Sequence, residues 1–122
     1  MSKKALSFLM VLMVAMLFTN CSEYYKIQKS GDYMMKYQKA KDYYDYEDYY
    51  HAKALLDDVV NVLRGTDKAE EAQMLYAYCH YKMHDYTMAA YYFEAFYKTY
   101  PYSTKSEDAY FMNAQCYYKD SP

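Results

Sequence analysis

The sequence contains no tryptophan and only two glycines and two prolines among its 122 residues. Sheet proteins need turn residues every roughly 8 to 12 positions, so the scarcity of glycine and proline argues against them. A helical protein needs far fewer turns. The composition therefore predicts an all-α chain, and its length allows one small domain at most.

The sequence also lacks the parts of an active site: it has no phosphate-binding glycine loop, no nucleophile elbow and no paired carboxylates in an apolar setting. His80 and His84 have the spacing of metal ligands on one helix face, but nothing supplies a third ligand and Cys79 lies on another side of the helix. We expect no enzyme, no metal and no cofactor other than a covalent lipid. The net charge of −2 argues against nucleic acid as a partner.

The first twenty residues have the three parts of a secretory signal peptide. Two lysines precede a mostly apolar run of 14 residues over 5–18, which is shorter than the roughly 20 residues of a permanent transmembrane helix. A cysteine directly after such a segment is typical of a bacterial lipoprotein, in which that residue carries acyl chains. We predict a lipoprotein signal peptide at 1–20 and lipidation of Cys21. Asn20 stands where a small residue is usual, so an ordinary signal peptide or an unrelated cysteine is the alternative.

A repeat of 37 residues runs through the rest of the chain. Shifting the sequence by this period aligns identical residues, namely Ala40, Ala77 and Ala114; Tyr44, Tyr81 and Tyr118; Ala52 and Ala89; Cys79 and Cys116. Two apolar sets also align, namely Ala52, Leu55, Leu56, Val59, Val60 and Leu63 with Ala89, Tyr92, Phe93, Phe96, Tyr97 and Tyr100. Their internal spacing places each set on one face of an α-helix. The sequence therefore predicts repeated helical hairpins.

Helix-start signals recur at the same period. Ser30, Asp67 and Thr104 are equivalent candidates for N-caps, and a glutamate follows three residues after the last two, as in a capping box. The expected first helices are 31–45, 68–83 and 105–119, and the expected second helices are 49–64 and 86–100. The repeats are then 30–66, 67–103 and an incomplete 104–122, preceded by a lipidated cysteine and polar tether at 21–29.

The unit resembles the tetratricopeptide repeat, lengthened from about 34 residues. Asp48-Tyr49-x-x-Ala52 and Asp85-Tyr86-x-x-Ala89 fit that family's motif at the hairpin turn, and Pro101 fits its final proline. The resemblance covers 30–122 and implies an α-solenoid of about two and a half repeats. Because the last expected helix has no partner for its apolar face, we expect an N-terminal part of a longer protein; dimerisation through this face is the alternative.

First helices of such repeats line a concave surface, and here the residues expected to face it form ladders. The predicted peptide-binding residues are Tyr37, Met74 and Phe111; Tyr44, Tyr81 and Tyr118; and Tyr78, Lys82 and Lys119. Aromatic side chains with flanking lysines suit an extended peptide that is rich in aromatic residues and ends in a carboxylate. Since tyrosine occurs 21 times, the alternative is that some of these side chains pack hairpin against hairpin.

Two further features have structural interpretations. Cys79 and Cys116 are one repeat apart, and equivalent residues of stacked helices lie roughly 10 Å from each other, beyond the reach of a disulfide. We expect both to be small buried hydrophobic residues. The tyrosine-rich acidic run 43–50 is expected to be a helix end, a turn and a helix start.

The motifs after Cys21, taken in order, resemble the BamD family, the lipoprotein subunits of the outer-membrane β-barrel assembly machinery. The matching stretches are Cys21-Ser22-Glu23-Tyr24, Lys36-Tyr37, Ala40-Lys41-x-Tyr43, Tyr49-x-x-Ala52-x-x-Leu55-Leu56, Leu63-Arg64-Gly65-Thr66, Ala69-Glu70-Glu71, Asp85-Tyr86-x-x-Ala89, Tyr92-Phe93, Tyr100-Pro101 and Cys116-Tyr117-Tyr118-x-x-Ser121-Pro122. The resemblance implies a lipid-anchored, periplasm-facing scaffold of the outer membrane without enzymatic activity. Its expected partners are a BamA-like barrel-forming subunit and unfolded outer-membrane proteins, which it helps to receive and insert.

Two other functions fit a repeat lipoprotein. A glycan-uptake lipoprotein also uses tetratricopeptide-like helices, but the absence of tryptophan, the usual platform for sugars, counts against it. A general tetratricopeptide lipoprotein of the cell envelope would differ only in its partner.

Overall fold

The computed structural model describes residues 2–122, with the backbone alone at 18–21. Its described regular structure is entirely helical: α1 Lys3–Lys29, α2 Tyr33–Asp45, α3 Tyr49–Val59, α4 Ala69–Lys82, α5 Tyr86–Thr99 and α6 Ser106–Asp120. The predicted all-α fold is confirmed. The chain divides into two units, Met1–Gly31 and Asp32–Pro122, each of which is described by itself.

The first unit is the helix α1. Ser2 caps it, because its hydroxyl accepts a hydrogen bond of 3.4 Å from the backbone N–H of Ala5. By length and composition α1 is apolar enough to cross a membrane, a test that a signal peptide also passes. Residues 22–29, expected to form a polar tether, continue this helix because no glycine or proline interrupts them before Gly31. The side chain of Cys21, the predicted lipidation site, lies outside the described residues.

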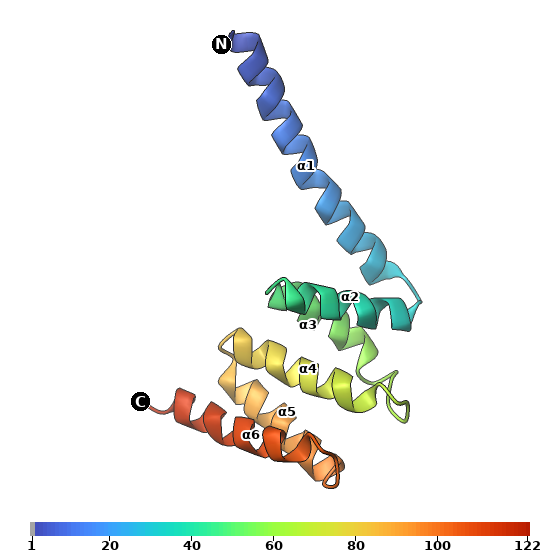
Figure 1. The fold of residues 1–122 in the computed structure, drawn as a ribbon, viewed down its shortest axis with the longest axis vertical. Helices are drawn as coiled ribbons and strands as arrows, with labels where there is room; N and C mark the ends of the chain where they lie inside the picture. Colours follow the sequence, from blue (N-terminus) through green and yellow to red (C-terminus); the bar gives the residue numbers. More distant parts are fainter. Residues whose placement is uncertain (1) are drawn as a thin grey trace. The chain divides into compact units, whose positions relative to one another are not determined.

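The second unit consists of the hairpins α2–α3 and α4–α5 followed by α6. From α3 on, each helix packs on the one before it in the sequence, which gives the zigzag stack seen in Figure 1, and α4 also contacts α2. The core lies along the second helices, where Leu55, Leu56, Phe93 and Phe96 are fully buried. The apolar faces predicted from the 37-residue period are thus the ones that pack inside.

Aspartates start both second helices. The Asp48 carboxylate accepts a hydrogen bond of 3.2 Å from the backbone N–H of His51, and Asp85 accepts one of 3.4 Å from Met88. Each bond satisfies a backbone donor that the first turn leaves free. The resemblance to the tetratricopeptide turn motif therefore has a physical basis, since its aspartate is the N-cap.

The first helices start differently from the prediction. Asp32, and not Ser30, caps α2, because its carboxylate accepts a hydrogen bond of 3.0 Å from the N–H of Met35. The other two predicted caps, Asp67 and Thr104, are also wrong, since neither α4 nor α6 has a side-chain cap.

The hydroxyl side chain one residue before each of these two predicted caps forms a hydrogen bond with the backbone instead. Thr66 and Ser103 accept hydrogen bonds of 3.2 Å from the backbone N–H groups of Lys68 and Lys105, respectively. A side-chain hydroxyl that accepts a hydrogen bond from the backbone N–H two residues later forms a local turn, and this turn replaces the expected helix cap. The acidic residues predicted for the first turns are present in both helices.

The turns within the two hairpins have the same backbone geometry. Glu47 and His84, one period apart, both have φ of 62°. In each turn the next aspartate donates its N–H to a carbonyl five residues back: Asp48 to Tyr43 and Asp85 to His80, both at 2.9 Å. These are helix ends closed by a left-handed residue without glycine. The run 43–50 is confirmed as a helix end, a turn and a helix start.

The helix α3 ends at Val59, five residues before the predicted boundary at residue 64. The chain continues in turns, in which the N–H of Leu63 still donates to the carbonyl of Val59 at 2.9 Å. Leu63 stays buried, so the predicted apolar face is kept although the regular helix is not. Gly65, with φ of 78°, ends this turn segment and not the helix itself.

Candidate partner-binding surface

The ladders predicted for peptide binding differ strongly in exposure from one hairpin to the next. In the first ladder, Tyr37 is 2% exposed and Met74 6%, whereas Phe111 is 56% exposed. Met74 belongs to the core cluster that also contains Phe93 of α5. Only Phe111, the last member of this ladder, on α6, is therefore exposed enough to contact a partner.

The second ladder lies at the closed ends of the hairpins. Tyr44 and Tyr81 each make an edge-on contact with a tyrosine of the following helix: Tyr44 with Tyr49 at 5.1 Å and Tyr81 with Tyr86 at 5.4 Å. Burial, the largest cause, raises the pKa of Tyr44 to about 12. These half-buried rings close their hairpins, while Tyr118, the third member, is 76% exposed.

Between the ladders, equivalent side chains link successive first helices. Lys41 on α2 forms an ion pair of 2.7 Å with Glu71 on α4. One period later, the hydroxyl of Tyr78 on α4 donates a hydrogen bond of 2.6 Å to Asp108 on α6. The hydrogen bond from Lys41 holds the pKa of Glu71 below its ordinary value. Burial, and after it the hydrogen bond to Asp108, raises the pKa of Tyr78. Tyr78 is thus a link between helices as well as a half-exposed ring.

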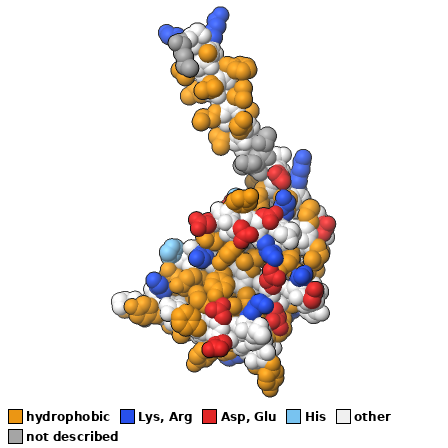
Figure 2. Space-filling model, viewed as in Figure 1, with side chains coloured by type: hydrophobic (Ala, Val, Ile, Leu, Met, Phe, Trp, Pro, Cys, Tyr) orange, Lys and Arg blue, Asp and Glu red, His pale blue; other side chains and the backbone are white. Residues whose placement is uncertain are grey.

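The exposed part of the predicted surface is concentrated on α6. We call the four exposed aromatic side chains of this helix and the adjacent lysine the α6 surface; they are Tyr110, Phe111, Tyr117, Tyr118 and Lys119. The four rings are 56 to 76% exposed. In Figure 2 hydrophobic side chains gather at the lower left of the second unit, over the region that α6 occupies in Figure 1. Contiguous exposed aromatic rings of this kind mark sites of interaction.

The predicted lysines flank this surface and the preceding first helix. Lys119 is exposed on α6, and its equivalent Lys82 is exposed at the end of α4. Of the nine predicted residues, Lys82, Phe111, Tyr118 and Lys119 are thus exposed, Tyr44, Tyr78 and Tyr81 are half-buried, and Tyr37 and Met74 are buried. The sequence did not single out Tyr110 and Tyr117, because their equivalents in α4 are a glutamine and a buried histidine.

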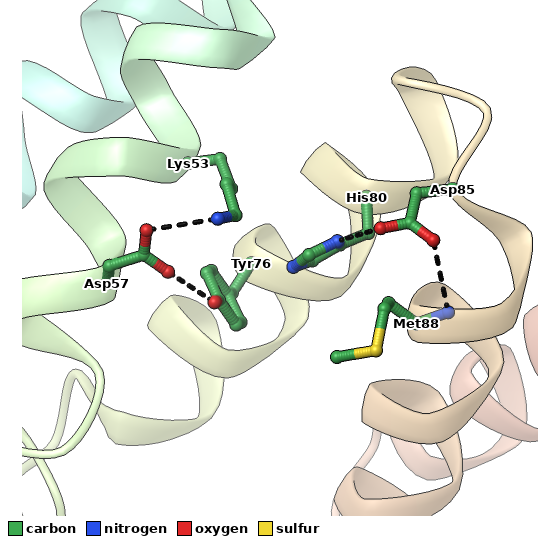
Figure 3. A network of polar contacts seen from close by, with 6 residues as sticks. All are labelled: Lys53, Asp57, Tyr76, His80, Asp85 and Met88. Carbon is green, nitrogen blue, oxygen red and sulfur yellow. Dashed lines mark hydrogen bonds and ion pairs between the residues drawn. The ribbon is translucent and has the colours of Figure 1, made fainter.

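A partly buried set of polar contacts around Tyr76 and His80, shown in Figure 3, was not predicted from the sequence. Tyr76 of α4 donates a hydrogen bond to Asp57 of α3, which also accepts one of 3.1 Å from Lys53. On the same helix the ring of His80 lies 3.1 Å from the Asp85 carboxylate that caps α5. Burial and the Asp57 carboxylate raise the pKa of Tyr76.

No repeat signal could have found this network, because its members change from unit to unit. The residues one period before and after Tyr76 are Lys39 and Asn113, and the latter donates to the carbonyl of Ala90 at 2.8 Å. His80 is buried and structural, whereas His84 is exposed in the hairpin turn. Among the residues that the structure describes, no three histidine, cysteine, aspartate or glutamate side chains are grouped as metal ligands.

Cys79 and Cys116 are free and fully buried. Burial raises the pKa of the Cys79 thiol to about 12 and that of Cys116 to about 11. Both therefore remain protonated and unreactive, and their prediction as small buried hydrophobic residues is confirmed.

Fold and surface together define a tetratricopeptide-like helical repeat protein with an apolar N-terminal helix and an exposed aromatic face. The family model described as YfiO, outer membrane lipoprotein, matches residues 30–122. The chain belongs to this family of outer membrane lipoproteins. No individually curated protein matches the sequence.

Proposed function

We propose that this protein is a lipid-anchored, periplasm-facing scaffold of the outer-membrane β-barrel assembly machinery. It docks on a BamA-like barrel-forming subunit and helps to receive and insert unfolded outer-membrane proteins, without catalysis. The observation that carries the proposal is an exposed aromatic surface on a repeat fold of the outer membrane lipoprotein family. The apolar helix α1, compatible with a signal peptide, supports export.

The chemistry of the α6 surface fits an unfolded outer-membrane segment. Such a segment is an extended strand whose alternate side chains are apolar or aromatic, and it ends in a carboxylate. Phe111 and Tyr118 offer exposed rings seven residues apart on one helix, and Lys119 offers a cation beside them. Aromatic rings gain from contact with other rings, and the lysine attracts the terminal carboxylate.

The structure changes which predicted residues this surface includes. Direct contact is proposed for the α6 surface and Lys82, with the half-buried Tyr78 and Tyr81 at its margin. Tyr37 and Met74 act indirectly, because they fill the space between helices and hold the first helices in place. Their substitution would change stability before it changed binding.

Binding of a strand-like peptide tests this surface. We would measure the affinity of the full chain, in detergent micelles, for a labelled peptide with alternating aromatic residues and a free C-terminus. The double variant Phe111→Ser and Tyr118→Ser should bind at least about tenfold more weakly, a loss of about 1.4 kcal/mol. Since both side chains are more than half exposed, the fold should persist.

A control removes two rings elsewhere that are at least as exposed as Phe111 and Tyr118. Tyr46 in the first hairpin turn and Tyr102 after α5 are 84% and 100% exposed, so Tyr46→Ser with Tyr102→Ser should leave the affinity unchanged. Equal losses in both double variants would mean that the α6 surface has no special role. Co-purification of the full chain with a barrel-forming subunit then tests the wider assignment to the assembly machinery.

The lipid anchor is tested separately at Cys21. Replacement by serine removes the thiol that would carry the lipid, so Cys21→Ser should release the protein from the washed membrane fraction. Incorporation of labelled palmitate into the native chain, and its absence from Cys21→Ser, should accompany this change. Labelled palmitate in Cys21→Ser would refute lipidation at this residue.

A further inference from the structure

A cavity of about 350 Å³ lies among α3, α4 and α5, and it shares no residue with the α6 surface. Its lining includes Asp57, Arg64, Tyr76, Tyr91, Tyr92 and Tyr100. A volume of this size is at the lower end for small-ligand sites and accommodates a group about as large as one aromatic residue. Tyrosine rings supply much of its wall.

The aromatic wall is held in place before any ligand arrives. Tyr92 stacks on the buried ring of His80, with centroids 5.1 Å apart and an interplanar angle of 28°. Tyr76 meets Tyr92 edge-on at 4.7 Å, and its hydroxyl is fixed by Asp57. Gln73 donates a hydrogen bond of 3.2 Å to the hydroxyl of Tyr100. A wall ordered in this way loses little conformational freedom when a ring binds against it.

The positive charge in the cavity comes from Arg64, the single arginine of the chain. Among the residues that the structure describes, Arg64 takes part in no ion pair. Asp57, the acidic residue of the cavity lining, is already paired with Lys53 and accepts the Tyr76 hydrogen bond. The guanidinium is therefore the cation available to a ligand, and its planar shape suits a carboxylate.

We propose that this cavity binds an aromatic carboxylate, with the ring among the tyrosines and the carboxylate on Arg64. A monoanion is favoured over a phosphate dianion because the Asp57 carboxylate in the same cavity repels the additional charge. The ligand is either the C-terminal aromatic residue of a polypeptide or a free N-acylated aromatic amino acid. If the ligand is a polypeptide end, the inference rests on the proposed function, which already assigns such a chain to this protein. Because the cavity and the α6 surface have no residue in common, variants at one site should leave binding at the other unchanged, and the two proposals can fail separately.

The absence of tryptophan provides a clean test. N-acetyl-tryptophan can be added to the full chain in detergent micelles and followed by tryptophan fluorescence, excited at a wavelength that the 21 tyrosines do not absorb, because the protein has no tryptophan of its own. Saturable binding is expected, and N-acetyl-tryptophan amide, which lacks the charge, should bind at least about tenfold more weakly. Equal affinity for the acid and the amide would overturn the role of Arg64.

Two exposed variants locate the site without loss of the fold. Arg64→Met should weaken binding of N-acetyl-tryptophan about tenfold, whereas Lys105→Met, which removes an exposed cation outside the cavity, should not change it. Tyr91→Ala, at a ring that is 61% exposed, should weaken binding about threefold. Unchanged affinity in both Arg64→Met and Tyr91→Ala would place any binding elsewhere and refute the proposal.

A peptide that ends in tryptophan separates the two sources of ligand. If the site serves polypeptide ends, this peptide should bind at least about tenfold more tightly than N-acetyl-tryptophan, and amidation of its C-terminus should abolish the advantage. Equal affinity of the peptide and N-acetyl-tryptophan would instead assign the cavity to a small aromatic acid.

Discussion

Lys41 and Glu71 join the first two hairpins through an ion pair of 2.7 Å. The same position one period later is occupied by a hydrogen bond of 2.6 Å from Tyr78 to Asp108. The repeat thus keeps the contact and changes its chemistry from an ion pair to a phenol–carboxylate hydrogen bond. The two links between first helices should therefore respond differently to pH.

Acid should weaken the first link. The pKa of Glu71 is lower in the folded chain than in the unfolded one, so the stability it contributes is present above the ordinary glutamate pKa and is lost as the pH falls through the folded value. Because both side chains are more than a third exposed, Lys41→Met should cost at most about 1 kcal/mol at neutral pH. Urea unfolding followed by circular dichroism would show this difference vanishing in acid; a difference that persists there would contradict it.

The hydroxyl of Tyr76 should contribute more than that of Tyr78. Tyr76 is 8% exposed and binds Asp57, so Tyr76→Phe should lower the free energy of unfolding by about 1.5 kcal/mol, whereas Tyr78→Phe, at a half-exposed ring, should cost about 0.5 kcal/mol. Thermal unfolding of the two matched variants would measure both effects. If Tyr78→Phe lowered the free energy of unfolding more than Tyr76→Phe did, the Lys53 ion pair alone would be enough to stabilise the Asp57 carboxylate.

Alkali provides a second test of the Tyr76 hydrogen bond. Its pKa is raised on folding, so the stability it contributes is present below the pKa of a free tyrosine, about 10, and is lost as the pH rises above that value. Tyr76→Phe removes this titration and should therefore lose less stability than the wild type between neutral pH and strong alkali. If the wild type and Tyr76→Phe lost the same free energy of unfolding in alkali, folding would not raise the pKa of Tyr76.

At the left-handed positions of the hairpin turns, glycine should be more stable than the residues present. Glu47 has φ of 62°, where a side chain costs about 1 kcal/mol, so Glu47→Gly should raise the free energy of unfolding by a few tenths of a kcal/mol after the entropy of the unfolded chain is deducted. Gly65→Ala should instead cost about 1 kcal/mol, although its Cβ would meet no atom within 4 Å. Chemical denaturation of both variants checks the opposite signs.

The two internal cysteines should be protected from modification. In Cys21→Ser, labelling of Cys79 and Cys116 by a thiol reagent near pH 8 should be more than about a hundredfold slower in the folded chain than in urea, because both thiols are buried and their pKa values are raised. Mass spectrometry would count the labelled thiols. Rapid labelling of the folded chain would show that the hairpins open locally.

Some local details could not be predicted although the pattern around them was correct. Asp48 and Asp85 follow a turn motif that the sequence displays, and both cap their helices. The predicted caps of α4 and α6 were wrong because the neighbouring hydroxyls of Thr66 and Ser103 accept hydrogen bonds from the backbone instead. Which of two neighbouring polar residues caps a helix depends on the backbone angles, and neither the composition nor the repeat period specifies these angles.

The sequence by itself determined the helical hairpins, their period and the faces that enter the core, because amphipathic spacing and turn residues act over a few neighbouring positions. Only the tertiary structure decided which of the repeated aromatic residues meet solvent. Met74 and Phe111 occupy equivalent positions, yet Met74 is buried beside Phe93 while Phe111 is exposed on α6. Exposure depends on what packs against a helix, and so does the Arg64 cavity, whose wall comes from three helices.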